Sequence, residues 1–201
     1  MSEEVSIGWI GPSEDRTALR AAATLLLDLG VDQAVYLGEA GFLEALVSEW
    51  TSELGGDGRP FLDRVVDVAE RGTPDHIAAL LQGQRSIRML SRLRTLPPAP
   101  SRAVEMLSGR IVLAVQDKKV LDEEDIANAS VIVFGKSKDW LFKRFGPRYF
   151  FSPGPLSKGR VGLIESDAEG RLELVGVDLS TGGESERHVL QGTSSRMTVA
   201  G

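Results

Sequence analysis

Several short apolar segments of this sequence are followed by polar side chains that could do chemistry. They comprise three carboxylates, an amide and two ammonium groups: Glu14, Glu39, Gln116, Asp117, Lys136 and Lys138. Carboxylates at the ends of neighbouring strands can hold divalent cations, because hard cations prefer oxygen ligands. An ammonium group has no acceptor lone pair and cannot bind a metal.

Histidine and cysteine, the other common metal ligands, are scarce. The chain has no cysteine, which excludes disulfides, thiolate nucleophiles and thiolate metal sites. Its two histidines are His76, near an expected helix start, and His188, in a polar C-terminal segment; we interpret both as facing solvent. Hydrolase sites for zinc, manganese or iron usually need several imidazoles together with carboxylates. The local sequence also shows no Ser-His-Asp arrangement.

The composition is typical of a single soluble globular domain. The 201 residues can bury one sizeable core, and 42% hydrophobic and 26% charged residues are ordinary values. No apolar run reaches the roughly 18 residues that a membrane helix needs, and the acidic start lacks the basic region of a secretory signal. The formal net charge of -6 argues against a general nucleic-acid-binding surface. We therefore expect a cytoplasmic protein without a membrane segment.

The first third of the sequence alternates expected strands and helices. The strands are predicted at 5–10, 33–37 and 64–69. Helices are predicted between the first two strands, where Ser13 can cap the start, and after the second. Another helical stretch follows at 73–94, with Thr73 as its cap, and Gly83 could divide it. This alternation is typical of a parallel, layered α/β sheet.

Residues from 103 onward are rich in expected strands. These strands cover 103–107, 110–115, 131–134, 149–151, 161–164 and 172–177. No internal repeat or second core is evident. We predict a single domain over residues 1–180 and a polar tail at 181–201, whose small residues bury little. One edge strand could form within this tail, at 196–199.

Two stretches of the chain carry a resemblance to a known family. Residues 30–39 end in Leu37-Gly38-Glu39, and residues 131–164 contain Gly135-Lys136-Ser137-Lys138 and Ser152-Pro153-Gly154-Pro155. In order and spacing these pieces resemble the Gly-Asp, Gly-His-Thr-His and Asn-Pro-Gly-Ser signatures of the calcineurin-like metallophosphoesterases, of the small bacterial and archaeal phosphodiesterase type. The resemblance covers roughly residues 5–178. It implies an α/β (α+β layered) fold, a two-sheet β-sandwich flanked by helices, with two metals at the strand ends.

The resemblance also identifies the positions that hold metals in active members, and here the ligands are largely missing. The matching positions are Pro12, Glu14, Glu39, Gln116, Asp117, Lys136 and Lys138. Proline has no ligand atom, and lysines stand at both histidines of the Gly-His-Thr-His signature. The third signature, Gly-Asn-x-[Asp/Glu], has two candidate places, 69–72 and 83–86, and neither offers the full set. The chain thus resembles a degenerate member of the family.

The missing ligands imply a protein that no longer hydrolyses phosphoesters. We interpret the chain as a pseudoenzyme without metal or other cofactor, acting as a protein-interaction or scaffold module, as the phosphoesterase-fold subunit of retromer does. One alternative is a residual or repurposed metal-dependent phosphoesterase. Another is an anion- or nucleotide-sensing module that uses Lys136 and Lys138 in the former active-site pit. These lysines either replace the metals as counter-ions to Glu39 and Asp117 or simply point into solvent.

A second group of residues could form a contact face. Basic and aromatic side chains alternate between 136 and 148, and the candidates are Trp140, Phe142, Lys143, Arg144 and Phe145. Such a mixture can bind nucleic acid or an acidic partner, although alternating aromatic residues in a strand usually face the core. We expect the partner to be another protein rather than nucleic acid, and a homo-oligomer is a further possibility.

Overall fold

The strands of the protein form two sheets. The computed structural model describes residues 5–55, 58–167 and 169–191. One sheet contains β1 (Ser6–Ile10), β2 (Gln33–Tyr36), β3 (Leu93–Thr95), β9 (Arg160–Ser166), β10 (Leu172–Asp178) and β11 (Glu184–Leu190), in the order β11-β10-β9-β1-β2-β3. The other contains β4 (Ala103–Leu107), β5 (Arg110–Val115), β6 (Val131–Phe134), β7 (Leu141–Phe145) and β8 (Arg148–Ser152), in the order β4-β5-β6-β8-β7.

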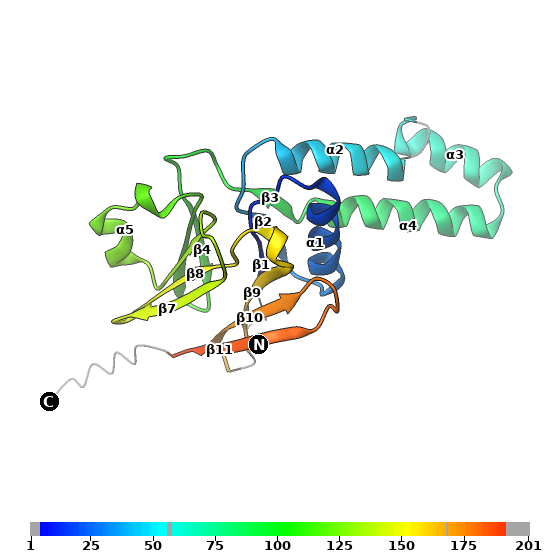
Figure 1. The fold of residues 1–201 in the computed structure, drawn as a ribbon. Coiled ribbons are helices and arrows are strands. Elements are labelled where there is room, and N and C mark those ends of the chain that lie inside the picture. The colour runs from blue at the N-terminus through cyan, green and yellow to red at the C-terminus, as the bar shows by residue number, and fades with distance from the viewer. Residues whose placement is uncertain (1–4, 56–57, 168, 192–201) are drawn as a thin grey trace, which may run out of the picture.

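The two sheets pack against each other, with helices on the outside (Figure 1). Strands β1, β2 and β3 run parallel in the first sheet, and β5, β6 and β8 run parallel in the second. The carboxyl ends of these parallel strands are where ligands bind in many sheet proteins. The two-sheet sandwich flanked by helices, which the resemblance implied, is confirmed.

Alternate residues of β1 belong to two different cores. Ile7 and Trp9 lie in the core between the sheets, whereas Ile10 lies in a second core beneath the helices. This division follows from the two-residue period of a strand, whose successive side chains point to opposite faces. Gly8 faces helix α1 (Arg16–Asp28), and its ideal Cβ position lies 2.6 Å from Cδ1 of Leu26. Glycine at this position therefore lets α1 pack close to the sheet.

The start of α1 differs slightly from the prediction. The Asp15 side chain caps the helix by accepting a hydrogen bond of 2.8 Å from the amide of Thr17. Ser13 instead accepts a hydrogen bond from the Asp15 amide at 3.0 Å and lies two residues before the capping position. Both residue types accept such bonds equally well, so sequence alone does not separate them.

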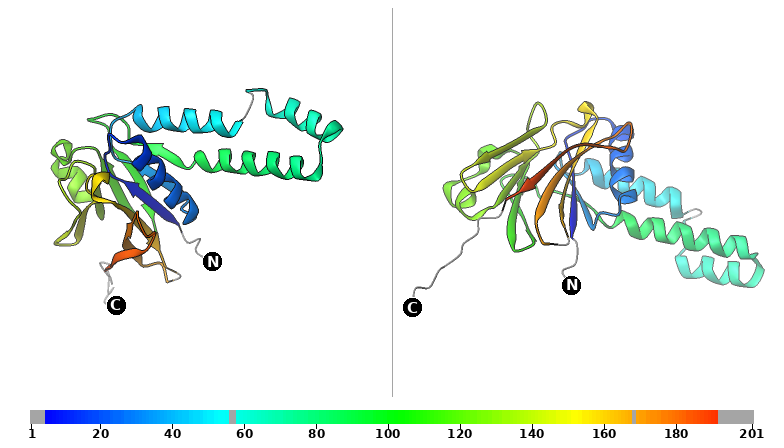
Figure 2. Two further views of the ribbon diagram at one scale, coloured as in Figure 1. Left: turned by 45° about the vertical axis from the view of Figure 1, so that its right-hand side comes forward. Right: turned by 90° about the horizontal axis from the view of Figure 1, so that it is seen from below.

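Three helices form an arm that projects from the sandwich (Figures 1 and 2). They are α2 (Phe42–Gly55), α3 (Phe61–Arg71) and α4 (Pro74–Leu90). The strand predicted at 64–69 is wrong, because these residues lie within α3. Their three valines favour a strand locally. However, Phe61, Val65 and Val68 are spaced so that they share one face of a helix. Gly83 does not divide the stretch, since α4 is continuous. Thr73 caps α4 as predicted, with exposed His76 completing a capping box.

The outer face of the second sheet is covered by a short helix, α5 (Glu123–Asn128). Ile126 and Leu121 pack there against Leu113, Ile132 and Phe150. Asp122 caps α5, and the Arg102 side chain contacts both Asp122 and Asp125. None of the helices in the described residues is both long and apolar enough to span a bilayer.

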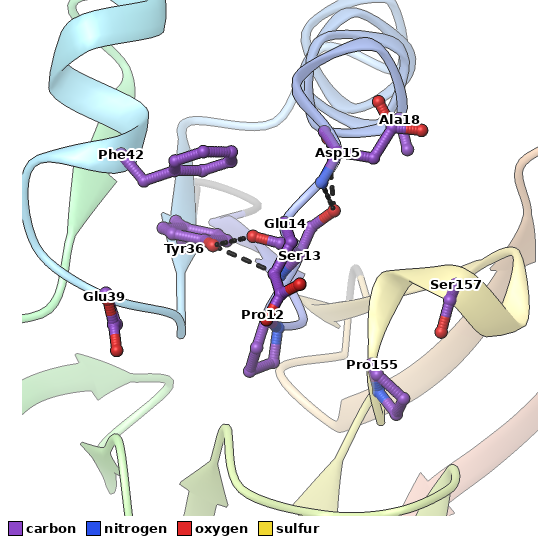
Figure 3. Close-up of a pocket in the computed structure, with 10 residues that line it drawn as sticks. All are labelled: Pro12, Ser13, Glu14, Asp15, Ala18, Tyr36, Glu39, Phe42, Pro155 and Ser157. Atoms are coloured by element: carbon purple, nitrogen blue, oxygen red, sulfur yellow. Dashed lines mark hydrogen bonds between the residues drawn. The ribbon is translucent and has the colours of Figure 1, made fainter.

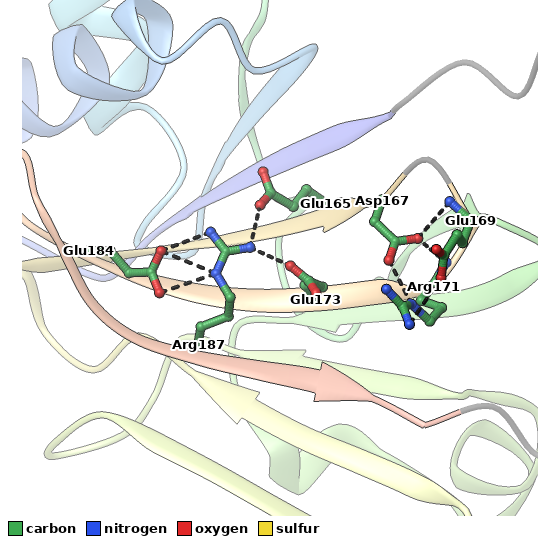
Figure 4. A network of polar contacts seen from close by, with 7 residues as sticks. All are labelled: Glu165, Asp167, Glu169, Arg171, Glu173, Glu184 and Arg187. Carbon is green, nitrogen blue, oxygen red and sulfur yellow. Dashed lines mark hydrogen bonds and ion pairs between the residues drawn. The ribbon is translucent and has the colours of Figure 1, made fainter.

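The polar tail predicted for 181–201 is wrong in its first half, because β11 forms there. Leu190 is buried, and β11 pairs with β10 in antiparallel register. Arg187 of β11 contacts three glutamates, Glu165, Glu173 and Glu184, so polar side chains hold this edge strand in place (Figure 4). The edge strand predicted at 196–199 lies outside the described residues.

His188, on the same strand, is half-buried rather than fully solvent-facing. Its ring stacks on Phe142 with centroids 4.4 Å apart, and its Nε2 atom lies 2.8 Å from Glu186. Phe142 belongs to β7, at the corresponding edge of the other sheet. The histidine thus helps to close one side of the sandwich.

Candidate functional site

The carboxyl ends of parallel strands from both sheets meet at one place. The loop after β1 contacts the loop after β8, since the Leu156 amide donates to the Pro12 carbonyl at 2.9 Å. The loop after β2 contacts the loop after β5, since the Gln116 side-chain amide donates to the Gly38 carbonyl at 2.9 Å. The Lys136 amide in turn donates to the Gln116 carbonyl at 2.8 Å. The fold therefore gathers the strand ends that the sequence singled out.

Two glycines make this close approach possible. An ideal Cβ on Gly11 would lie 1.7 Å from the carbonyl oxygen of Gly154, and one on Gly135 would lie 2.3 Å from that of Leu37. Both obstacles are backbone atoms, which cannot rotate away as a side chain can. The strand ends are thus in direct backbone contact, and little room is left between them.

One ion pair forms among the predicted site residues. The Lys136 ammonium lies 3.2 Å from Oδ2 of Asp117, whose side chain is 23% exposed, whereas that of Lys136 is 76% exposed. Asp117 also accepts a hydrogen bond of 3.0 Å from the Lys119 amide. These contacts lower the pKa of Asp117, the Lys119 amide contributing most and Lys136 adding to it, while partial burial opposes them. Asp117 is therefore held as a carboxylate that its own chain already satisfies.

The remaining charged residues of the predicted set do not join this pair. Glu14, Glu39 and Lys138 are all exposed, and none of them forms an ion pair with another described residue. The expected pairing of both lysines with Glu39 and Asp117 is thus realised only for the pair Lys136–Asp117. Lys138 matches the alternative, a lysine that points into solvent.

A pocket of about 730 Å³ opens beside these strand ends (Figure 3). Its walls include Pro12 and Phe42, and its charged residues are all acidic: Glu14, Asp15 and Glu39. At its base the Tyr36 hydroxyl donates to the Ser13 carbonyl at 3.0 Å and accepts from the Ser13 amide at 3.2 Å. Burial raises the pKa of Tyr36, so the phenol stays protonated and the loop after β1 is held in place. Three of its lining residues, Pro12, Glu14 and Glu39, are among the predicted site residues, and the others were not predicted because the pocket joins three separate segments.

These residues do not fit a two-metal centre. No group of three or more His, Asp or Glu side chains within 5–55, 58–167 and 169–191 is placed to hold a metal ion. Of the signature positions at the strand ends, Pro12 has a pyrrolidine ring without a ligand atom, Gln116 has one amide oxygen, and Lys136 and Lys138 have ammonium groups. A divalent cation would meet positive charge from Lys136 and too few oxygen or nitrogen ligands.

The architecture matches solved structures of one fold group. Vps29 from Cryptosporidium parvum is 10% identical with a TM-score of 0.52, over 94% of this chain and 99% of that one. A predicted phosphoesterase from Streptococcus pneumoniae is 12% identical with a TM-score of 0.51, over 94% and 99%. Vps29 from Entamoeba histolytica, solved with Zn²⁺, is 13% identical with a TM-score of 0.50, over 93% and 100%. The chain has the metallophosphoesterase-like fold.

At the level of sequence the likeness is distant. No protein-family model matches the sequence. No curated protein matches it either. The comparison with solved structures therefore establishes the fold and leaves activity to be argued from the residues of this chain.

Neither of the two stretches that partly match the third signature lies at a strand end. Residues 69–72 lie at the end of α3 and residues 83–86 lie inside α4, so both are on the projecting arm. The third parallel strand of the first sheet is β3, and Leu96-Pro97-Pro98 follows it. These residues carry no side-chain ligand. Because β3 has three residues, its sequence signal is too short to find.

The predicted contact face is divided between core and surface. Phe142 stacks on Tyr149 at 5.6 Å and Trp140 packs edge-on to Phe151 at 4.9 Å, so both are half-buried and structural. Lys143 and Phe145 are exposed, on the opposite side of β7. Arg144 reaches back to the side chain of Gln191 at 2.9 Å. The alternation of a strand therefore puts two of the five candidates, Lys143 and Phe145, on its outer side, where Phe145 packs edge-on against Phe150.

Proposed function

We propose that this chain is a catalytically inactive protein of the metallophosphoesterase-like fold that acts as a protein-interaction or scaffold module. The observation that carries the proposal is the Lys136–Asp117 pair at the strand ends. The exposed Lys136 ammonium lies there within ion-pair distance of Asp117, the one carboxylate of the predicted set that is partly buried. The protein thereby supplies its own counter-ion at the place where a metal would need free carboxylates.

The residual-enzyme alternative requires a group that activates water or a phosphoester. A metal does this by lowering the pKa of bound water and by polarising the phosphoryl oxygen. The side chains at the strand ends offer no imidazole, and the unpaired Glu14 and Glu39 belong to no group of three or more such ligands among the described residues. Glu39 alone, exposed and unpaired, would act as a weak base with nothing to stabilise the charge that develops on phosphorus.

The anion-sensing alternative is disfavoured by charge. The pocket at the strand ends is lined by three carboxylates and no lysine or arginine. Lys136 already has Asp117 as its counter-ion, and Lys138 is exposed. A phosphate or nucleotide would therefore meet like charge in the pocket, whereas a basic or apolar segment of a partner protein would not.

Affinity capture from the native cell, with tagged wild type and variants, tests the interaction role. We expect a partner protein to be enriched with wild type and lost with the pocket double variant Glu14→Lys/Glu39→Lys, because reversing both charges removes the complementarity. Asp28→Lys, an exposed charge reversal at the far end of α1, is the matched control and should retain the partner. A partner retained by the double variant would contradict the pocket as its binding surface. No enriched partner with wild type would contradict the scaffold role itself.

A further inference from the structure

The far end of the helical arm exposes large apolar side chains. Helix α3 has no buried residue, and Leu62 and Val66 on it are 72% and 55% exposed. On α4, Ile77 and Leu81 are 44% and 47% exposed. The arm projects away from the sandwich, so no other described part of the molecule covers this end (Figures 1 and 2).

These four side chains lie on one side of the α3–α4 hairpin. In α3, the exposed Leu62 and Val66 come directly after the half-buried Phe61 and Val65. In α4, the exposed Leu81 comes directly after the half-buried Leu80. Each residue is rotated by about 100° around the helix axis from the one before it. Because the two helices run antiparallel, this rotation points the exposed residues of both helices to the same side of the hairpin. We call Leu62, Val66, Ile77 and Leu81 the tip face.

The charges around the tip face suit a second copy of the chain. Residues 61–90 contain four acidic residues and four basic ones, a sum of zero, while the whole chain carries a net charge of -6. The acidic residues are Asp63, Asp67, Glu70 and Asp75, and the basic ones are Arg64, Arg71, Arg85 and Arg88. Two copies would repel each other over the rest of the surface, but not here.

The distribution of these charges along the hairpin is also self-complementary. Arg85 and Arg88 continue the line of Ile77 and Leu81 toward the sandwich, and neither has an ion-pair partner among the described residues. The rim of α3 carries unpaired acidic side chains such as Asp63. In a two-fold interface, the unpaired arginines of α4 in one copy can face the acidic side chains of α3 in the other copy. The symmetry repeats this match, so both copies gain the same contacts.

The size of the tip face indicates a weak association. The length of the face is that of α3, whose 11 residues rise 1.5 Å each, and its width is that of two helices of about 10 Å. The area of the face is therefore a few hundred Å². Stable interfaces bury about 800 Å² per partner. The contact should therefore depend on concentration rather than hold a permanent dimer.

We propose that the tip face is a self-association surface through which two copies of this chain pair about a two-fold axis. The apolar centre provides the favourable burial, at about 25 cal/mol per Å², and the neutral, mixed charges around it permit close approach. The proposal is independent of the strand-end site, which lies at the opposite end of the arm.

Sedimentation velocity over a concentration series tests this pairing. The wild type should rise from the 21.7 kDa monomer mass toward twice that value as its concentration increases from about 5 to about 500 µM. Leu62→Asp and Leu81→Asp should stay monomeric throughout. Met106→Asp, which changes an equally exposed apolar residue on β4, is the matched control and should behave as wild type.

Thermal melting of all four proteins checks that each is folded, which we expect because the changed side chains are exposed. A wild type that remains at the monomer mass over the whole series overturns the proposal and leaves the tip face to a different protein. Loss of the dimer in Met106→Asp, with its retention in Leu81→Asp, overturns it as well.

Discussion

A chain ending after Ser180 is expected to lose about 3 kcal/mol or more of its unfolding free energy, relative to a chain ending after Gln191. The shorter chain lacks β11 and with it the buried side chain of Leu190, whose burial alone stabilises by about 1.5–3 kcal/mol. It also uncovers Leu174 on β10 and leaves Glu173 without Arg187. The longer chain keeps all of these contacts and is therefore the proper reference.

Urea denaturation of the two truncated chains, followed by far-UV circular dichroism, measures this loss. For a domain of this size, 3 kcal/mol corresponds to a fall in melting temperature of about 6–12 °C. An insoluble shorter chain would agree with the prediction, because removing β11 exposes the apolar edge of β10. Equal midpoints for the two chains would show that β11 does not contribute to the folded state.

Gly11→Ala is expected to destabilise the protein by about 3 kcal/mol or more, or to prevent folding. The new methyl group would lie 1.7 Å from the carbonyl oxygen of Gly154, well inside contact distance. Relief would require the loop after β1 to move away from the loop after β8, which would break the hydrogen bond between Leu156 and Pro12. Comparison of unfolding free energies from denaturant titration measures the effect.

Gly55→Ala is the matched control for this substitution. Gly55 ends α2, and an added Cβ there meets nothing within 4 Å. Alanine has the higher helix propensity, so the change should be neutral or stabilise by up to about 1 kcal/mol. If Gly11→Ala were as stable as Gly55→Ala, the strand ends would not be in the close contact described above.

The sequence was sufficient to predict the elements whose pattern is purely local. The continuous apolar segments at 110–115 and 131–134 form strands β5 and β6, as expected for buried parallel strands. The valine-rich stretch at 64–69 was predicted as a strand but lies in helix α3. Its apolar residues show helical spacing only when Phe61 is counted with them. Strand β11 was missed because its stability comes from Arg187 and from pairing with β10, and neither appears in the hydrophobicity of residues 184–190.

The candidate site was predictable in position but not in its contacts. The order of the short motifs placed Glu39, Gln116 and Lys136 at strand ends that the fold does bring together. Lys136 pairs with Asp117 and not with Glu39. This choice depends on the geometry of the loops, which the sequence motifs do not specify. The acidic pocket and the absence of a third ligand after β3 likewise needed the three-dimensional arrangement.

The manganese content of the purified protein tests most directly whether the strand ends still form a metal centre. The protein is equilibrated with excess Mn²⁺, dialysed against metal-free buffer and analysed for metal per chain. Manganese is preferred to zinc here, because it is less prone to bind the isolated histidines His76 and His188. A variant lacking one of the two unpaired carboxylates of the predicted set, Glu39→Ala, is treated in parallel.

We predict less than about 0.1 manganese per chain for both proteins, since Asp117 already pairs with Lys136 and no group of three or more His, Asp or Glu side chains in the described residues is placed to hold a metal. About one or more manganese per wild-type chain, lost in Glu39→Ala, would show that the strand ends hold a metal. That result would contradict the inactive interpretation.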